Sequence, residues 1–594
     1  MLSRTGVPRG GSRRFGIPRE LASMPRDMPA HRRPPRVRMS PPGGGDPLSR
    51  GRDALARCDW SAARDLFLET TAGSDHAEAL EGLGWAFHYL DDEEHMFDAR
   101  ERAYRVYLER GDHRSAARVA MWLAFDYAEF RGDRAVASGL FERARELLAG
   151  VEVSAEHAWL AIIEAHEVLL GEKDPTRATA LATDALRIAL EAGSRDLAVM
   201  ARAVEGLARV TAGHIEEGMR RLDAAVAAAV GGEMQDINAI GPVCCYIIHA
   251  CERVRDYERA SQWCERLKEL TTRWSSQALL GTCRVQYAGV LMSRGEWRAA
   301  EAELTAGRDL LARVRPGLAR GALPRLAELR RRQGDWEEAA VLFRRVEHTP
   351  LGQLGLAELA YDQQDFAGAA DLAERYLRRF AADDQLERAP GLELLARTRI
   401  AQHDDRAAAA LVAEIQGIAT LVGTPPLAAS AAVTAGLLEL ARGAFGDARR
   451  RFEDAVDLFS RSGCPFEAGC ARLELARALE ALGRPAPSRA EALGARQALA
   501  HLGACRLVER IDAFLDGLTP APTAGAKGER RATLTAREVE VLRLVARGLS
   551  DKEIAARLSL SPHTIHRHVS NILLKLEQPS RAAAVALATR QALM

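Results

Sequence analysis

The chain has 594 residues, too many for a single hydrophobic core, and its 82 basic side chains balance its 82 acidic ones. Hydrophobic residues make up 47% of the sequence but aromatic residues only 5%, which favours helices over β-sandwiches. No apolar run approaches the roughly 20 residues that span a bilayer. We therefore expect an almost all-α, cytoplasmic protein without a membrane partner. The balanced total charge gives no information on whether a nucleic acid is a partner.

Residues 1–47 are predicted to be a disordered tail. They combine Arg, Pro, Gly and Ser with too few apolar side chains to offset the entropy of an ordered chain. They also lack the apolar core of about 7 to 15 residues that a secretory signal needs. Between Met1 and Arg50 there are eleven arginines and three acidic residues. We interpret the segment as a tail without function or as the product of a misassigned start codon; a DNA-binding arm is the alternative.

A repeated phrase dominates residues 48–518. Its clearest copies end on an Ala three positions after an aromatic residue, and they lie at Arg294–Ala300, Gln333–Ala339, Gln363–Ala369 and Arg442–Ala448. Weaker copies contain Cys58, Gly132 and Arg255. The final Ala recurs with a period near 40 residues, so we expect roughly ten or eleven helical hairpins, several of them degenerate. Gly would end one helix in a left-handed conformation, and an acidic residue would begin the next.

The second helix of the predicted hairpin has a small residue, a large one four positions on, and a small one three further. This spacing occurs at Ala448, Phe452 and Ala455 and again at Ala137, Phe141 and Ala144. In these residues the chain resembles the tetratricopeptide family, although its period exceeds that family's usual length of about 34 residues. The resemblance implies an α-solenoid whose surface holds an unidentified peptide, protein or small-molecule effector.

The nine cysteines form no CxxC pair, so we interpret them as buried free thiols of a reducing compartment and expect no structural zinc. The segment His88–His95 combines two histidines with four acidic residues, and we interpret it as a hairpin turn; a metal or acid–base role is the alternative. The sequence has no phosphate-binding GxxxxGK[ST] loop, HExxH pair or nucleophile elbow. We expect neither an enzyme nor a cofactor.

Residues 519–533 are predicted to be a flexible linker, and residues 534–594 a small DNA-binding domain. Thr535 and Glu538 have the spacing of a capping box, followed by inward apolar positions at Val539, Leu542, Val545 and Ala546. Gly548 would end this helix. Ser550 and Glu553 form a second capping box for a short helix with Ile554, Ala555 and Leu558 turned inward.

A third helix is predicted to begin at Ser561-Pro562, since Pro suits the first helical position. Its apolar positions lie on one side and its polar and basic positions on the other, namely Ile565, Val569, Ile572, Leu573 and Leu576 against His563, His566, Arg567, Ser570, Asn571 and Lys575. A helix with a basic outer side after a short helix and a tight turn is the geometry that enters the DNA major groove. The three histidines of this helix share no face and have no Cys or acidic partner nearby, so no metal site is expected.

The run Leu534–Leu576 closely resembles the LuxR/GerE family, whose domain is a four-helix helix-turn-helix. The resemblance implies that His566, Arg567 and Ser570 face base edges, while Lys552, Thr564, His568 and Lys575 approach phosphates or support the helix. The family often has Lys where His566 stands, which weakens the contact expected there. Arg567 is the leading candidate for direct readout of guanine. A fourth helix, about Arg581 to Leu593, would pair two domains as a homodimer on DNA or close the core.

The sequence thus favours a DNA-binding transcriptional regulator in which the repeats sense or dock a partner and the last domain binds double-stranded DNA and acts on RNA polymerase. The runner-up is a repeat scaffold whose last domain contacts proteins. A cryptic enzyme is a distant third.

Overall fold

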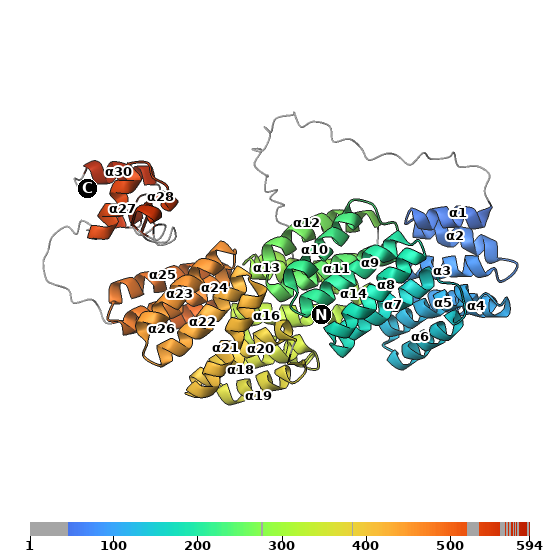
Figure 1. Cartoon of the computed structure of the whole chain (residues 1–594), viewed down its shortest axis with the longest axis horizontal. Coiled ribbons are helices and arrows are strands. Elements are labelled where there is room, and N and C mark those ends of the chain that lie inside the picture. Colours follow the sequence, from blue (N-terminus) through green and yellow to red (C-terminus); the bar gives the residue numbers. More distant parts are fainter. Residues whose placement is uncertain are drawn as a thin grey trace, which may run out of the picture. The chain divides into compact units, whose positions relative to one another are not determined.

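The computed structural model describes most of the chain (Figure 1). The described residues are 46–274, 277–382, 384–518, 534–558 and 581–590, together with 565, 568, 569, 572, 573, 575, 576, 578 and 593. The predicted tail up to residue 45 and the predicted linker 519–533 lie outside them. All regular elements in the described ranges are helices, which confirms the all-α prediction. None of these helices is both long and apolar enough to cross a membrane.

The helices between residues 47 and 502 pair into hairpins, each with a first and a second helix that pack together. The first helices are α1 (Pro47–Ala56), α3 (Ala77–Leu90), α5 (His113–Asp126), α7 (Ala155–Glu167), α9 (Arg195–Thr211), α11 (Ile237–Val254), α13 (Gln277–Ser293), α16 (Leu323–Gln333), α18 (Pro350–Asp362), α20 (Gln385–Ala401), α22 (Pro425–Ala441) and α24 (Pro465–Ala481). The second helices are α2 (Trp60–Thr71), α4 (Glu93–Glu109), α6 (Arg134–Leu148), α8 (Pro175–Glu191), α10 (Ile215–Val230), α12 (Tyr257–Trp274), α14 (Trp297–Val314), α17 (Trp336–Arg344), α19 (Phe366–Leu377), α21 (Asp405–Val422), α23 (Phe445–Arg461) and α25 (Pro485–Leu502).

Shorter elements complete this helical-repeat body, by which we mean residues 47–518. The π-helical turns η1 (Tyr127–Arg131) and η2 (Val168–Glu172) extend α5 and α7, α15 (Pro316–Ala319) and η3 (Arg320–Ala322) precede α16, and α26 (Cys505–Gly517) follows the last hairpin.

The described part of the body contains twelve hairpins, whereas the sequence led us to expect ten or eleven. Successive second helices mostly begin 39 to 42 residues apart, which confirms the period near 40. Two intervals are shorter, with 33 residues from the start of α2 to that of α4 and 30 from α17 to α19. These two compact hairpins make room for the additional repeat.

The turn inside each hairpin has the same backbone conformation. In all twelve, the residue two positions before the second helix has a positive φ, as the predicted left-handed cap requires. Six of these residues are Gly, but the other six are not: Cys58, Asp91, Lys173, Arg255, Gln364 and His403. A left-handed conformation costs a non-glycine residue about 1–2 kcal/mol, so packing of the paired helices overrides the local preference at half of the turns.

The repeated aromatic and alanine positions lie in the seams between helices, as predicted. Ala300, Ala339, Ala369 and Ala448 are fully buried, and Trp297 is nearly so. Small residues allow the helix backbones to approach closely: a Cβ added at Gly218 on α10 would lie 2.5 Å from the carbonyl oxygen of Gly206 on α9. The phrase is therefore a packing motif of the hairpins.

Contacts also join hairpins that are far apart in the sequence. Residues of α13–α17 and of α24–α26 share one hydrophobic cluster. At its edge the rings of Trp297 and Phe466 lie 5.5 Å apart, and the guanidinium of Arg506 lies 5.3 Å from the Trp336 ring. The repeats therefore do not contact only their immediate neighbours.

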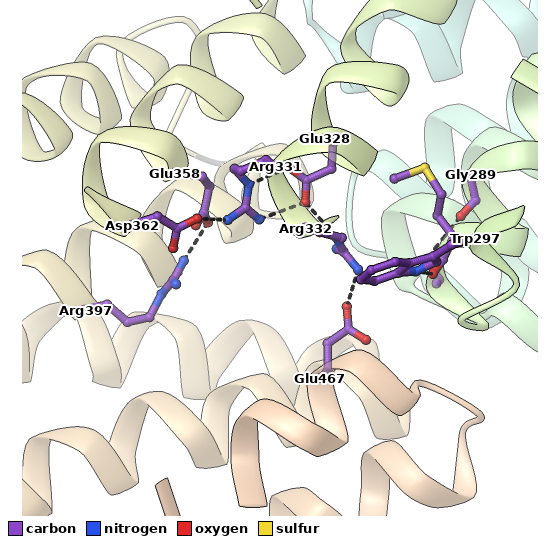
Figure 2. A network of polar contacts seen from close by, with 11 residues as sticks. Gly289, Trp297, Glu328, Arg331, Arg332, Glu358, Asp362, Arg397 and Glu467 are labelled. Atoms are coloured by element: carbon purple, nitrogen blue, oxygen red, sulfur yellow. Dashed lines mark hydrogen bonds and ion pairs between the residues drawn. The ribbon is translucent and has the colours of Figure 1, made fainter. Parts of the chain in front are cut away.

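A polar network accompanies this apolar contact (Figure 2). Glu328 on α16 accepts hydrogen bonds from Arg331 and Arg332, and these two arginines bind Asp362 on α18 and Glu467 on α24. Burial opposes ionisation of Glu328, but the two guanidinium groups hold its pKa at about 2. Arg397 on α20 adds a bond of 2.5 Å to Glu358 on α18. The network thus links four first helices through ionised side chains.

Candidate DNA-binding surface

The last part of the chain folds around a small core of its own. It contains α27 (Ala536–Ala546), α28 (Asp551–Leu558) and α30 (Arg581–Arg590), with helical residues between α28 and α30 at 565, 568, 569, 572, 573 and 575. Its core joins residues from all of these segments, namely Val541, Leu542, Leu544, Ile554, Ala555, Ile565, Val569, Ile572, Leu576, Ala584 and Ala588.

The N-terminus of α27 is fixed by the predicted capping box. The backbone N–H of Glu538 donates to the Thr535 hydroxyl over 3.2 Å, and the N–H of Thr535 donates to the Glu538 carboxylate over 2.7 Å. Gly548 has φ 81° and follows the end of the helix, also as predicted. Two donors at the helix start are thereby satisfied within one turn.

The predicted apolar side of α27 is partly wrong. Leu542 is buried as expected, but Ala546 is exposed, and Val541 and Leu544 were not predicted although they are buried in the core. The segment Val539–Ala546 has apolar residues on several helix faces, so spacing alone did not select the correct one. The three-residue step from Val541 to Leu544 was the signal available in the sequence.

The second capping box, before α28, is also confirmed. The N–H of Ser550 donates to Glu553 over 2.8 Å, and the N–H of Glu553 donates to the Ser550 hydroxyl over 3.4 Å. Hydrogen bonds from Ser550 lower the pKa of Glu553. At the same helix start, Asp551 pairs with Arg581 of α30 over 2.7 Å. This ion pair, which the sequence analysis did not foresee, joins the short helix to the last one.

The described residues of the third helix confirm its predicted apolar side. Ile565, Val569, Ile572 and Leu576 are buried, and Leu573 packs against the same core. The four buried positions recur every three or four residues, as one side of a helix requires. The third helix is therefore seated by its apolar side between α27, α28 and α30.

An ion pair anchors the end of this helix. The Lys575 ammonium donates to Glu538 over 2.6 Å, so the side chain that completes the capping box of α27 also holds the third helix. Burial opposes ionisation of Glu538, but hydrogen bonds from Lys575 and Thr535 keep its pKa below the ordinary value. Lys575, 37% exposed, was expected to approach phosphate or to support the helix, and its contact is of the supporting kind.

Of the other residues predicted to contact DNA, the structure describes only His568 fully. His568 lies in the helix and is half-buried. Thr564, His566, Arg567 and Ser570, and the side chain of Lys552, lie outside what the structure describes. Their roles at DNA remain predictions from the sequence. Among the described residues no group of three His, Cys, Asp or Glu side chains could hold a metal ion, at the third helix or in the hairpin turn at His88–His95.

Comparison with known families gives this arrangement its identity. Residues 532–588 match the family described as bacterial regulatory proteins, luxR family. The C-terminal domain is a LuxR-type helix-turn-helix domain. It carries both capping boxes and the whole apolar core that seats the third helix.

Two curated relatives share this LuxR-type domain. The nitrate/nitrite response regulator protein NarP of Escherichia coli (strain K12) is 43% identical over 67 residues, which are 11% of this chain and 31% of NarP. The response regulator protein VraR of Staphylococcus aureus (strain Mu3 / ATCC 700698) is 46% identical over 59 residues, 10% of this chain and 28% of VraR. The match thus spans less than a third of the length of either relative.

A solved structure is similar over a larger part of the chain. It is the crystal structure of the APC/C hetero-tetramer Cut9-Hcn1. The match covers 79% of this chain and 90% of the matched chain in that structure, with a TM-score of 0.42 and 12% sequence identity.

Proposed function

We propose that the chain is a DNA-binding transcriptional regulator that acts in the cytoplasm. Its LuxR-type domain would read the major groove of double-stranded DNA with the third helix. The observation that carries this proposal is the burial of Ile565, Val569, Ile572 and Leu576, because a helix seated by that side has its intervening positions available for a partner. The sequence places His566, Arg567 and Ser570 at such positions.

Charge supports DNA as the partner. From Leu534 to the end of the chain, nine Lys and Arg residues oppose five acidic ones, although the chain as a whole is balanced. A net positive domain neutralises phosphates and releases their counterions on binding. Lys575 is engaged by Glu538, so we assign the phosphate contacts to Lys552, Thr564 and His568 and give Lys575 the role of positioning the helix.

The last helix is proposed to pair two copies of the domain on DNA. One domain with few basic side chains offers few phosphate contacts, and a second copy doubles them. In α30 Ala584 and Ala588 are buried in the core, Val585 is half-buried and packs against the same core, and Thr589 is exposed. We place the dimer contact on the Val585 side of the helix.

The helical-repeat body is proposed to receive the signal. Hairpin repeats present extended surfaces that hold peptides, proteins or small molecules, and we assign the effector to this body. The output would be contact between the DNA-bound regulator and RNA polymerase. The proposed role of every part is binding rather than catalysis.

The deciding experiment compares the full chain with a chain that ends at Leu518. Targets are first identified by chromatin mapping with the intact protein, and affinity for one such duplex is then measured across a salt series. The full chain should bind with a steep loss of affinity as salt rises, and the shortened chain should not bind. A full chain that does not bind duplex DNA even at low salt would support a protein scaffold instead. Equal binding by the shortened chain would show that the LuxR-type domain is not the DNA-binding part.

A further inference from the structure

Four of the nine cysteines converge on one cavity in the middle of the helical-repeat body. Cys244 and Cys245 come from α11, Cys264 from α12 and Cys283 from α13. The cavity has an empty volume of about 510 Å³, counting the part that opens to solvent. The sequence showed these residues only as separate helical cysteines without a CxxC pair.

The rest of the wall is mainly apolar. Ile248, Leu267 and Leu280 contribute aliphatic side chains. The charged side chains of the lining are Arg284 and Glu303, whose nearest charged atoms lie 3.6 Å apart and compensate each other. An uncharged ligand therefore suits this cavity better than an ion, because a net charge would lose its hydration without gaining a counter-charge.

The thiols are free and uncharged at neutral pH. Burial raises the pKa of Cys245 to about 11 and that of Cys264 to about 12, and it also raises the pKa of Cys283 well above its ordinary value. Thiolate character controls alkylation and disulfide exchange, so these groups are slow in both reactions. They are suited instead to a thiophilic ligand atom that replaces the proton of each thiol as it binds.

Two of the four cysteines are, as whole residues, less completely buried than the others. Cys244 and Cys264 are buried, with 3% and 8% of their surface exposed, whereas Cys245 and Cys283 are only half-buried. Among the described residues no set of three His, Cys, Asp or Glu side chains could hold a metal ion. We therefore consider ligands that two thiols of this cavity can bind.

We propose that this cavity is a dithiol site for an uncharged, thiophilic ligand, with a trivalent organoarsenical as the chemical class and Cys245 and Cys283 as the two sulfur donors. The inference concerns a binding site and holds whether or not the chain regulates transcription. The organic group of the ligand would lie against Ile248, Leu267 and Leu280.

The binding step balances without an oxidant or reductant. With phenylarsine oxide, two As–S bonds form while both S–H bonds and the arsenic–oxygen bonding break. The oxygen leaves as water together with the two thiol protons. Arsenic stays trivalent, and the product is uncharged, as the apolar wall requires.

The test uses the reduced full chain and phenylarsine oxide. Intact-mass spectrometry should find one phenylarsenic group per chain that survives a wash with excess monothiol and is removed by 2,3-dimercaptopropanol. Cys245→Ser and Cys283→Ser should each weaken retention by about 100-fold or more, because one remaining bond lacks the gain from simultaneous attachment. Cys505→Ser, which changes an exposed thiol elsewhere, should retain the adduct like the unaltered chain.

A footprint on the unaltered chain makes the test independent of how the variants fold. After phenylarsine oxide treatment and unfolding, N-ethylmaleimide should fail to label Cys245 and Cys283 and should label the other cysteines. Absence of a stable adduct, an adduct that survives both serine substitutions, or protection of a different pair would overturn the proposal.

Discussion

Arg332 on α16 donates a hydrogen bond of 3.0 Å to Glu467 on α24, although 135 residues separate them in the sequence. Arg332 is also held by Glu328 over 2.7 Å, and its guanidinium lies 4.6 Å from the centre of the Phe466 ring. The bond therefore sits where the polar network meets the hydrophobic cluster shared by α13–α17 and α24–α26 (Figure 2).

Glu467→Ala should destabilise the contact between these two groups of helices by about 1–3 kcal/mol, because it leaves a largely buried guanidinium with one acidic partner fewer. Native-state hydrogen exchange at the amides of α16 and α24 measures this loss locally. Asp447→Ala is the matched control, since Asp447 pairs with Arg450 on an exposed surface and should change the same amides by less than about 0.5 kcal/mol.

A double-mutant cycle separates the pair from the rest of the network. Arg332→Ala combined with Glu467→Ala should cost less than the sum of the single changes, because the second substitution removes the charge that the first left unpaired. Strict additivity would show that the two side chains contribute independently and would contradict the coupling.

Two glycine-to-alanine changes within helices should have opposite signs. Gly218→Ala on α10 should destabilise its hairpin by about 1–3 kcal/mol, because the new methyl would meet the Gly206 carbonyl oxygen at 2.5 Å and neither backbone can move alone. Gly417→Ala on α21 has no atom within 4 Å of the new methyl and should stabilise by about 0.5–1 kcal/mol through helix propensity. Hydrogen exchange in α9–α10 and in α20–α21 reports each effect, and equal signs would contradict the close approach.

Glu538→Gln should destabilise the LuxR-type domain by about 1–2 kcal/mol at pH 7, because it removes the charge that Lys575 binds while keeping a capping side chain. The pKa of Glu538 is lower in the folded chain than its ordinary value of 4.5. Its stabilising contribution is therefore complete above about pH 4.5 and is lost as the pH falls through the folded pKa. The difference between the two chains should shrink in that range.

Hydrogen exchange at the α27 amides, corrected for intrinsic rates between pH 7 and about pH 3, follows this dependence. Glu540→Gln is the control, because Glu540 pairs with Arg537 at the surface and should cost less than about 0.5 kcal/mol at any pH. A penalty for Glu538→Gln that does not change with pH would exclude the ionised pair as its cause.

Arg567→Ala should weaken binding to a mapped target duplex by about 1–3 kcal/mol and relax the preference for guanine at one position, if its guanidinium reads a base edge. Lys552→Ala should weaken binding equally on all duplexes and reduce the salt dependence by about one phosphate contact. Measuring both variants on target and scrambled duplexes distinguishes base readout from phosphate contact. An unchanged target affinity for Arg567→Ala would remove it from the interface.

Local features of the fold could be predicted because they depend on residues near one another in the sequence. Both capping boxes, the apolar side of the third helix and the hairpin period follow from spacings of three to about 40 residues. The roles of Arg567 and its neighbours at DNA rest on the sequence and its resemblance alone, since these residues lie outside the described structure.

Features that join distant residues could not be predicted in this way. Lys575 and Glu538 are 37 residues apart, and Arg332 and Glu467 are 135 apart, so no periodicity connects them. The convergence of Cys245 and Cys283 depends on how α11 and α13 pack. The left-handed turns at residues such as Arg255 and Gln364 are imposed by helix pairing, because neither residue favours that conformation.

The hydrophobic cluster of α13–α17 and α24–α26 has a consequence for biosynthesis. The ribosome completes α13–α17 long before it reaches α24. Hydrophobic side chains of α13–α17, such as Trp297, therefore lack their partners from α24–α26 while the nascent chain is being made. We therefore expect newly made chains to pass through an aggregation-prone intermediate that chaperones protect. Chains truncated before Pro465 are expected to aggregate rather than persist as shorter repeat arrays.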